Sequence, residues 1–159
     1  MAKDKERTKV HINLPNHWAT GGESLWVRSL GGDLYEIDNV QFYAYGINYL
    51  DVVRATEDAP HLKPSVREVI RPSGHSTIRV SFDKLPRERQ AEILEQLKPF
   101  DASYERATSS LVAIDITPAG NVWKVRELLD DLEAAGLLFY ETCEARVEGS
   151  FDDLPSAEE

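Results

Sequence analysis

His75 is the residue whose neighbours in the sequence best suit chemistry. It follows Gly74 and precedes Ser76 at the start of a predicted strand, where a side chain can meet solvent. An imidazole that is oriented by a carboxylate can act as a general base, and Asp51 or Asp38 could supply that carboxylate. The alternative is that His75 bonds to backbone groups and fixes a hinge, since no second catalytic motif accompanies it. His75 is therefore a candidate catalytic residue in a chain that we expect not to be an enzyme.

Residues that could bind a metal or act as nucleophiles are dispersed along the chain. The four histidines show no paired spacing and have no cysteine partner, so we expect no metal site and no cofactor. Cys143 alternates with Glu141 and Ala145 in a predicted strand, which favours a small core residue over a nucleophile. A single cysteine excludes an internal disulfide framework and favours the cytoplasm. GxGxxG, GxSxG, HExxH and Walker motifs do not occur in the sequence.

Acidic charge is concentrated in the second half of the sequence. Residues 1–72 carry a net charge of −1 and residues 73–159 a net charge of −9, which together give −10. Such a half repels phosphate backbones, so we expect no nucleic-acid partner, and it attracts a basic protein. The alternative is that the charge only keeps the protein in solution. The predicted partner-binding surface consists of Glu127, Asp130, Asp131, Glu133, Glu141 and Glu144.

Aromatic residues gather in the first half of the chain. They could form a stacking platform for single-stranded nucleic acid, but only Arg28 and Arg54 are close to them in the sequence. We therefore interpret the aromatic residues as core residues and as a seam between domains. The expected interdomain or anchor residues are Trp26, Tyr43, Tyr45, Asp51, His75, Arg79 and Tyr140.

The elements that must position these residues indicate an α+β fold. Short alternating segments predict a small antiparallel β meander or partly closed barrel over residues 10–72. Its predicted strands cover residues 9–14, 23–30, 34–37, 40–45 and 66–71, and Gly31-Gly32 is a predicted hairpin turn. Residues 49–55 are expected to begin with a single helical turn and to continue as a strand through Ala55. Residues 1–9 are predicted to be disordered.

Helical periodicity enters only in the second half. Predicted strands at 77–82, 102–108, 111–116 and 137–147 alternate with predicted helices at 86–97 and 122–135. This order is that of a ferredoxin-like βαββαβ domain, which we place at residues 73–147. Asn121 and Gly136 are the expected caps of the second helix. The acidic tail, residues 148–159, is predicted to be disordered.

Four spaced motifs carry a resemblance to a known family. They are E-S-L-W at 23–26, D-N-V-Q-F at 38–42, G-I-N-Y-L-D-V-V at 46–53 and S-G-H-S-T-I-R-V at 73–80. Together they resemble the bacterial domain of unknown function 4265 family over roughly residues 10–147. The resemblance implies no catalytic residues, because the family has no established activity.

Size, acidity and the lack of a catalytic signature favour an interaction protein. The most concrete version is an immunity or antitoxin-type protein that binds and occludes a basic cognate toxin, since small acidic proteins are often encoded beside toxin genes in bacteria. The alternative is a small-molecule-sensing regulatory domain of ferredoxin-like type, and the third candidate is an enzyme built on His75. We expect a monomer or homodimer with no membrane partner, because no apolar run could cross a bilayer.

Overall fold

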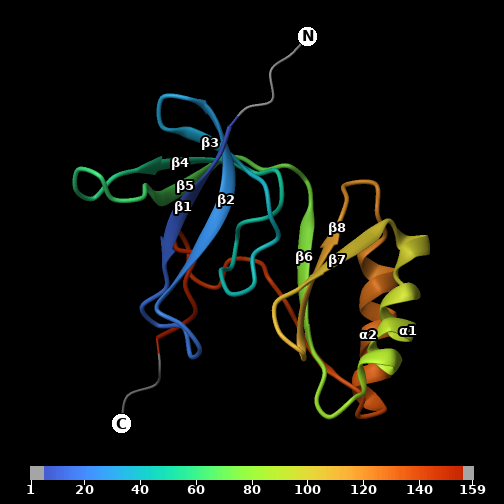
Figure 1. Ribbon diagram of the computed structural model, residues 1–159. Coiled ribbons are helices and arrows are strands. Elements are labelled where there is room, and N and C mark those ends of the chain that lie inside the picture. The colour runs from blue at the N-terminus through green and yellow to red at the C-terminus, as the bar shows by residue number, and fades with distance from the viewer. Residues whose placement is uncertain (1–5, 156–159) are drawn as a thin grey trace. The chain divides into compact units, whose positions relative to one another are not determined.

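The computed structural model describes residues 6–155 (Figure 1). It divides the chain into two compact units. The first comprises residues 1–73 and 144–159, and the second comprises residues 74–143. The fold is α+β and mostly β, with antiparallel sheets and two small helices. No helix within residues 6–155 is long and apolar enough to cross a membrane.

Five strands of the first unit pair in a ring. They are β1 (Arg7–Asn13), β2 (Gly22–Gly31), β3 (Leu34–Ile37), β4 (Val52–Thr56) and β5 (Ser65–Arg71). Successive strands pair antiparallel, and a parallel pair between His11 of β1 and Ser65 of β5 closes the ring. The predicted Gly31-Gly32 turn is confirmed, since both residues have positive φ angles, of 104° and 59°. Alternate residues such as Val10, Leu25 and Val27 are fully buried inside the ring.

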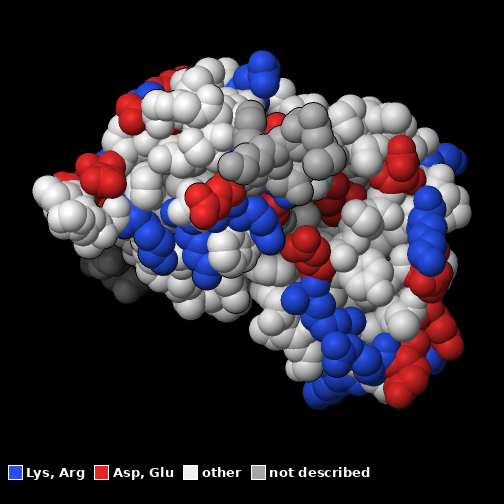
Figure 2. Space-filling model, turned by 45° about the horizontal axis from the view of Figure 1, so that its top comes forward, with Lys and Arg blue, Asp and Glu red and all other residues white. Residues whose placement is uncertain are grey.

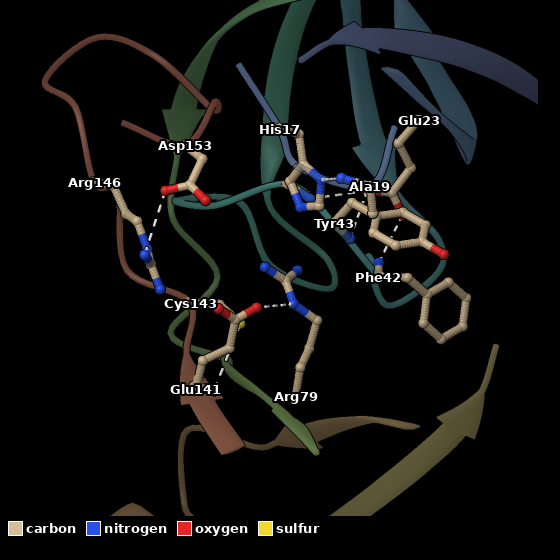
Figure 3. A network of polar contacts seen from close by, with 11 residues as sticks. His17, Ala19, Glu23, Phe42, Tyr43, Arg79, Glu141, Cys143, Arg146 and Asp153 are labelled. Atoms are coloured by element: carbon tan, nitrogen blue, oxygen red, sulfur yellow. Dashed lines mark hydrogen bonds and ion pairs between the residues drawn. The ribbon is translucent and has the colours of Figure 1, made fainter. Parts of the chain in front are cut away.

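The aromatic segment at residues 40–45, predicted to be a strand, is a loop. The carboxylate of Glu23 on β2 accepts hydrogen bonds from the backbone N–H groups of Phe42, Tyr43 and Ala44, at 2.6, 3.0 and 3.0 Å (Figure 3). These N–H groups turn toward one side chain, so they cannot form a strand ladder. Hydrogen bonds to the buried Glu23 carboxylate therefore hold this segment as a loop, although its composition predicts a strand.

The second unit is a four-stranded antiparallel sheet with two helices. Its elements are β6 (Ser76–Ser81), α1 (Arg87–Glu95), a 3-10 turn (Lys98–Phe100), β7 (Ala102–Arg106), β8 (Leu111–Ile116), α2 (Val122–Ala134) and β9 (Phe139–Thr142). The strand order is β7-β8-β6-β9. Figure 1 shows α1 and α2 on the same face of this sheet. Their apolar residues, including Ile93, Val125 and Leu129, are buried against Ile78 and Ile114.

The ends of α2 follow the predicted capping chemistry. The side-chain oxygen of Asn121 accepts a hydrogen bond from the backbone N–H of Lys124 at 3.1 Å. Gly136 has a φ of 78° and donates its N–H to the carbonyl of Glu133. A residue without a Cβ takes this left-handed conformation most easily. Both caps are confirmed.

The ends of the chain differ from the prediction. The predicted disorder at 1–9 is wrong from Arg7 onward, where β1 begins, and residues 1–5 lie outside the described residues. The last strand ends at Thr142, and residues 144–155 pack on the first unit. There the N–H of Tyr45 bonds to the carbonyl of Phe151 at 2.9 Å. The predicted disorder at 148–159 is therefore wrong for residues 148–155, because one aromatic residue and backbone bonds anchor them; residues 156–159 are not described.

Candidate functional site

His75 and Asp115 form a pair within the second unit. His75 precedes β6 directly, and Asp115 lies on β8, which pairs with β6. Nδ1 of His75 lies 2.9 and 3.0 Å from the two carboxylate oxygens of Asp115. Both side chains are largely buried. An imidazole held by a carboxylate at Nδ1 has a fixed orientation, and its Nε2 is then the atom that can exchange a proton.

Burial is the main influence on the charge of Asp115. It raises the pKa of the Asp115 carboxyl above its ordinary value of 3.8, while the hydrogen bond and the charge of His75 act in the opposite direction. The carboxylate on this strand is therefore costly to ionise without its partner. The pair can serve either as a proton-transfer group or as a purely structural contact.

The carboxylates expected to orient His75 have other partners. Asp51 accepts hydrogen bonds from the backbone N–H groups of Asn48 and Ser73, both at 2.8 Å. Asp38 forms salt bridges with two arginines of the first unit. Within the second unit the carboxylate that faces His75 is therefore Asp115, whereas Asp51 and Asp38 belong to the first unit. The signal for Asp115 was present in the sequence, since a carboxylate within the apolar strand LVAIDI requires a polar partner.

Four predicted acidic residues lie on α2. Glu127, Asp130, Asp131 and Glu133 are all exposed, whereas Val125 and Leu129 turn to the core. Two of the four carboxylates bind Tyr140 of β9. Asp130 accepts a hydrogen bond from the hydroxyl of Tyr140, and Glu133 accepts one from the backbone N–H of Tyr140 at 3.0 Å.

Tyr140 therefore links β9 to α2. Burial raises the pKa of the Tyr140 hydroxyl, and the hydrogen bond to Asp130 raises that pKa further, while Arg126 lowers it. The hydroxyl thus remains protonated and keeps donating to Asp130 at neutral pH. Asp130 and Glu133 bind Tyr140, and Glu127 forms a salt bridge with Lys124 at 3.7 Å. Asp131 is therefore the acid of α2 that is most available to a partner.

The remaining two predicted acidic residues lie outside α2. Glu141 lies opposite Arg79 in the pairing of β9 with β6, and the two side chains form a salt bridge at 3.0 Å (Figure 3). Arg79 is only 2% exposed, whereas the Glu141 side chain is 34% exposed. Glu144 belongs to the first unit.

The negative charge that is concentrated in the second half of the sequence is divided between both units of the structure. Because residues 144–159 join the first unit, that unit carries a net charge of −6 and the second unit −4. On the face seen in Figure 2, Lys and Arg side chains lie beside Asp and Glu side chains.

The aromatic residues of the first unit have different environments. Tyr45 is fully buried, and the guanidinium of Arg146 lies 4.4 Å from its ring centre. The ring of Tyr43 meets that of His17 edge-on at 5.3 Å. Trp26, by contrast, is 41% exposed. Tyr45 fits the prediction of a core aromatic residue, whereas Trp26 does not.

Glu23 and Asp152 are two buried carboxylates that sequence reasoning missed. Glu23 holds the 42–44 loop, and Asp152 accepts the backbone N–H of Asn16 at 2.8 Å. For Glu23, the signal was its place in a strand of alternating residues, on the inward side shared with Leu25 and Val27. Asp152 had no such signal.

No cluster suited to a metal ion occurs in the part of the chain that the structure describes. No group of three or more His, Cys, Asp or Glu side chains converges there. Cys143 is buried, as predicted, with its sulfur 4.0 Å from the carbonyl oxygen of Glu141.

Comparison with known proteins gives a family and a fold. The family model described as "Domain of unknown function (DUF4265)" matches residues 23–140. No curated protein matches the chain. The crystal structure of a hypothetical protein from Neisseria gonorrhoeae is similar, with a TM-score of 0.74 and 14% sequence identity, covering 89% of this chain and 97% of that one. At this identity the similarity shows the fold alone.

Proposed function

We propose that this chain, which belongs to the DUF4265 family of domains of unknown function, is a non-enzymatic module that binds a basic protein. In its most concrete form it is a cytoplasmic immunity or antitoxin-type protein, monomeric or homodimeric, that occludes the basic cleft of a cognate toxin. The proposed contact surface is the exposed face of α2, defined by Trp123, Glu127, Asp130, Asp131 and Glu133 and called the α2 surface below.

One observation carries this proposal: the last turns of α2 hold three carboxylates and no basic residue. The carbonyl groups at a helix C-terminus carry partial negative charge, so anions there cost about 0.3–1 kcal/mol each. Asp130 and Glu133 recover some of this cost through Tyr140. Asp131 has no hydrogen bond or salt bridge of its side chain among the described residues. A destabilising charge without a structural partner is expected where function requires it.

An exposed tryptophan accompanies these charges. Trp123 begins the same helix and is 68% exposed, with the guanidinium of Arg126 5.2 Å from its ring centre. Positions 123, 127, 130 and 131 recur at helical spacing, so Trp123 and the acids share one face. Tryptophan is enriched among the residues that dominate binding energy, and the surrounding carboxylates would steer a basic partner.

The test is affinity purification from the native host with the full-length protein and two charge variants. Asp131→Lys should reduce recovery of a basic partner roughly 2–5-fold, as expected for one interfacial charge. Asp83→Lys makes the same charge change at an exposed position outside α2 and should leave recovery unchanged. The captured protein, expressed alone, should arrest growth, and co-expression of the wild-type protein should relieve the arrest. Recovery of no basic protein, or equal recovery by both variants, contradicts the proposal.

A second candidate function follows from the sheet of the second unit. We propose that this unit is ferredoxin-like, which is supported by the order of its elements and by the strand order β7-β8-β6-β9. Such a sheet suits a small-molecule-sensing regulatory domain. A thermal-shift screen tests this alternative, because a saturating ligand raises the melting temperature.

A third candidate rests on the His75–Asp115 pair. As a general base, His75 would take a proton at Nε2 while Asp115 stabilises the imidazolium. Full retention of the biological effect in a folded His75→Ala variant would exclude this role.

A further inference from the structure

A basic aromatic surface lies on the outside of the first unit, where β1 pairs with β2. Lys9 faces Trp26 and Arg7 faces Arg28 in the register of the two strands. Because side chains alternate along a strand, these four residues share the face opposite to the buried residues such as Val10. Cross-strand pairing thus gathers residues that are far apart in the sequence.

Two cations lie close to the indole ring of Trp26. The guanidinium carbon of Arg7 is 4.7 Å from the ring centre, and the ammonium nitrogen of Lys9 is 4.8 Å from it. Both distances are within the range of cation–π attraction. With 41% of its surface exposed, Trp26 remains accessible between them.

Two more cations border the same face. Arg28 shares the carboxylate of Asp38 with Arg7, at 3.1 and 2.7 Å respectively. Lys63 donates to the hydroxyl of Ser24, two residues before Trp26 on β2, at 2.9 Å. We call this set, Arg7, Lys9, Trp26, Arg28 and Lys63, the Trp26 platform.

The Trp26 platform is positive within an acidic unit. Its four cations face two carboxylates, Asp38 and Glu36, the latter opposite Arg28 on β3. The unit as a whole has a net charge of −6. A local excess of cations around one exposed tryptophan therefore cannot be ascribed to the overall composition.

We propose that the Trp26 platform binds single-stranded nucleic acid. A base would stack on the indole ring, and the flexible Lys9 would move from the ring to a neighbouring phosphate. A ligand for this surface needs both a flat ring and negative charge, and an unpaired nucleotide chain supplies both. An acidic peptide would satisfy the cations alone, and a duplex hides the faces of its bases.

This proposal revises the expectation that nucleic acid is excluded. That expectation rested on overall charge and on the lack of basic residues close to the aromatic residues in the sequence. The overall negative charge still opposes binding, so the affinity should depend strongly on salt. The platform shares no residue with the α2 surface, so either proposal can fail without the other.

The test uses the full-length protein and a fluorescently labelled 12-nucleotide oligo-dT in an anisotropy titration at low salt. Neutralisation of three or four phosphates predicts a slope of about −2 to −3 in a plot of log affinity against log salt. Trp26→Ala should weaken binding about tenfold, and Trp26→Phe, which keeps a stacking ring, should restore most of it. Lys9→Glu should weaken binding and flatten the salt dependence.

Two matched controls test whether the loss of binding is specific to the Trp26 platform, rather than the result of losing any exposed tryptophan or any surface lysine. Trp18→Ala removes another exposed tryptophan, which is 82% exposed, and Lys84→Glu makes the charge change of Lys9→Glu at an exposed position in the second unit. Both should bind oligo-dT as the wild type does. Circular dichroism and urea unfolding verify that each variant is folded.

Three results would overturn the proposal. The first is no binding of oligo-dT by the wild-type protein at low salt. The second is equal affinity for an abasic oligonucleotide of the same length, which would mean that the platform attracts polyanions without stacking. The third is tighter binding of poly-glutamate than of oligo-dT, which would assign the surface to an acidic protein.

Discussion

Buried carboxylates organise the local structure of this protein, and they do so in two ways. Glu23 and Asp51 accept backbone N–H groups and thereby fix loops. Asp115 instead faces the imidazole of His75. A buried carboxylate that accepts N–H groups acts as a structural anion, whereas one that faces a titratable ring ties the stability of the fold to pH.

Asp115 should make stability depend on pH with a defined sign. Its pKa in the folded protein is raised, so its contribution is fully present below the unfolded carboxyl pKa of 3.8 and is lost as pH rises through the raised value. Asp115→Asn cannot titrate and should not show this loss. The free energy of unfolding of the wild type, measured relative to that of the variant by urea titration, should therefore fall as pH rises above 3.8. A difference that is constant over this range would contradict the assignment.

At the scale of elements, α2 illustrates how a helix can form despite unfavourable charges at its end. Asn121 caps its first turn, and Val125 and Leu129 bury its apolar side. The cap and the buried side chains stabilise the helix by more than the acidic residues in its last turns destabilise it, since burying a Leu side chain contributes about 1.5–3 kcal/mol. The helix therefore remains stable although it carries the acidic residues that we propose to contact a partner.

Removing one of these charges should stabilise the protein. Asp131→Asn is expected to raise the free energy of unfolding by about 0.3–1 kcal/mol at low salt, because it removes an anion from a helix C-terminus. Glu88→Gln is the matched control, since Glu88 lies in the first turn of α1, where a carboxylate is favourable, and its loss should lower stability.

Urea titrations at low and high salt measure both variants. Both effects should shrink at 1 M salt, where the Debye length is about 3 Å. The same sign of change in the two variants would show that the interaction with the helix dipole is not responsible.

At the scale of the whole molecule, the C-terminal segment completes the first unit. Gly46 has a φ of 76°, and a Cβ added there would lie 2.8 Å from the Cβ of Ala145. Gly32 also has a positive φ, of 59°, but an added Cβ would meet nothing within 4 Å. A substitution at Gly32 therefore tests backbone strain alone, whereas a substitution at Gly46 tests backbone strain together with the contact to the C-terminal segment.

Gly46→Ala should lower the free energy of unfolding more than Gly32→Ala does. The left-handed conformation costs each variant about 1–2 kcal/mol. The clash with Ala145 adds about 1–3 kcal/mol at Gly46 alone. Urea unfolding of the two variants measures the difference, and equal losses would mean that the C-terminal segment does not pack there.

What the sequence by itself determined is local. The Gly31-Gly32 turn, the strands at 34–37 and 111–116 and the caps of α2 were predicted correctly, and the α+β class with them. Each depends on residues that are neighbours in the chain, whose dihedral preferences and periodicity are readable directly. The prediction of a strand at 40–45 failed because the distant Glu23 overrides the propensity of its aromatic residues.

Only the tertiary structure decided which distant residues meet. It joined His75 to Asp115, placed Arg7 and Lys9 beside Trp26, and assigned residues 144–155 to the first unit. Such contacts depend on strand register and on which surfaces are buried together, and these are settled by packing over the whole core. Composition and periodicity carry no record of that packing, so the partners of single residues emerge only when the chain is folded.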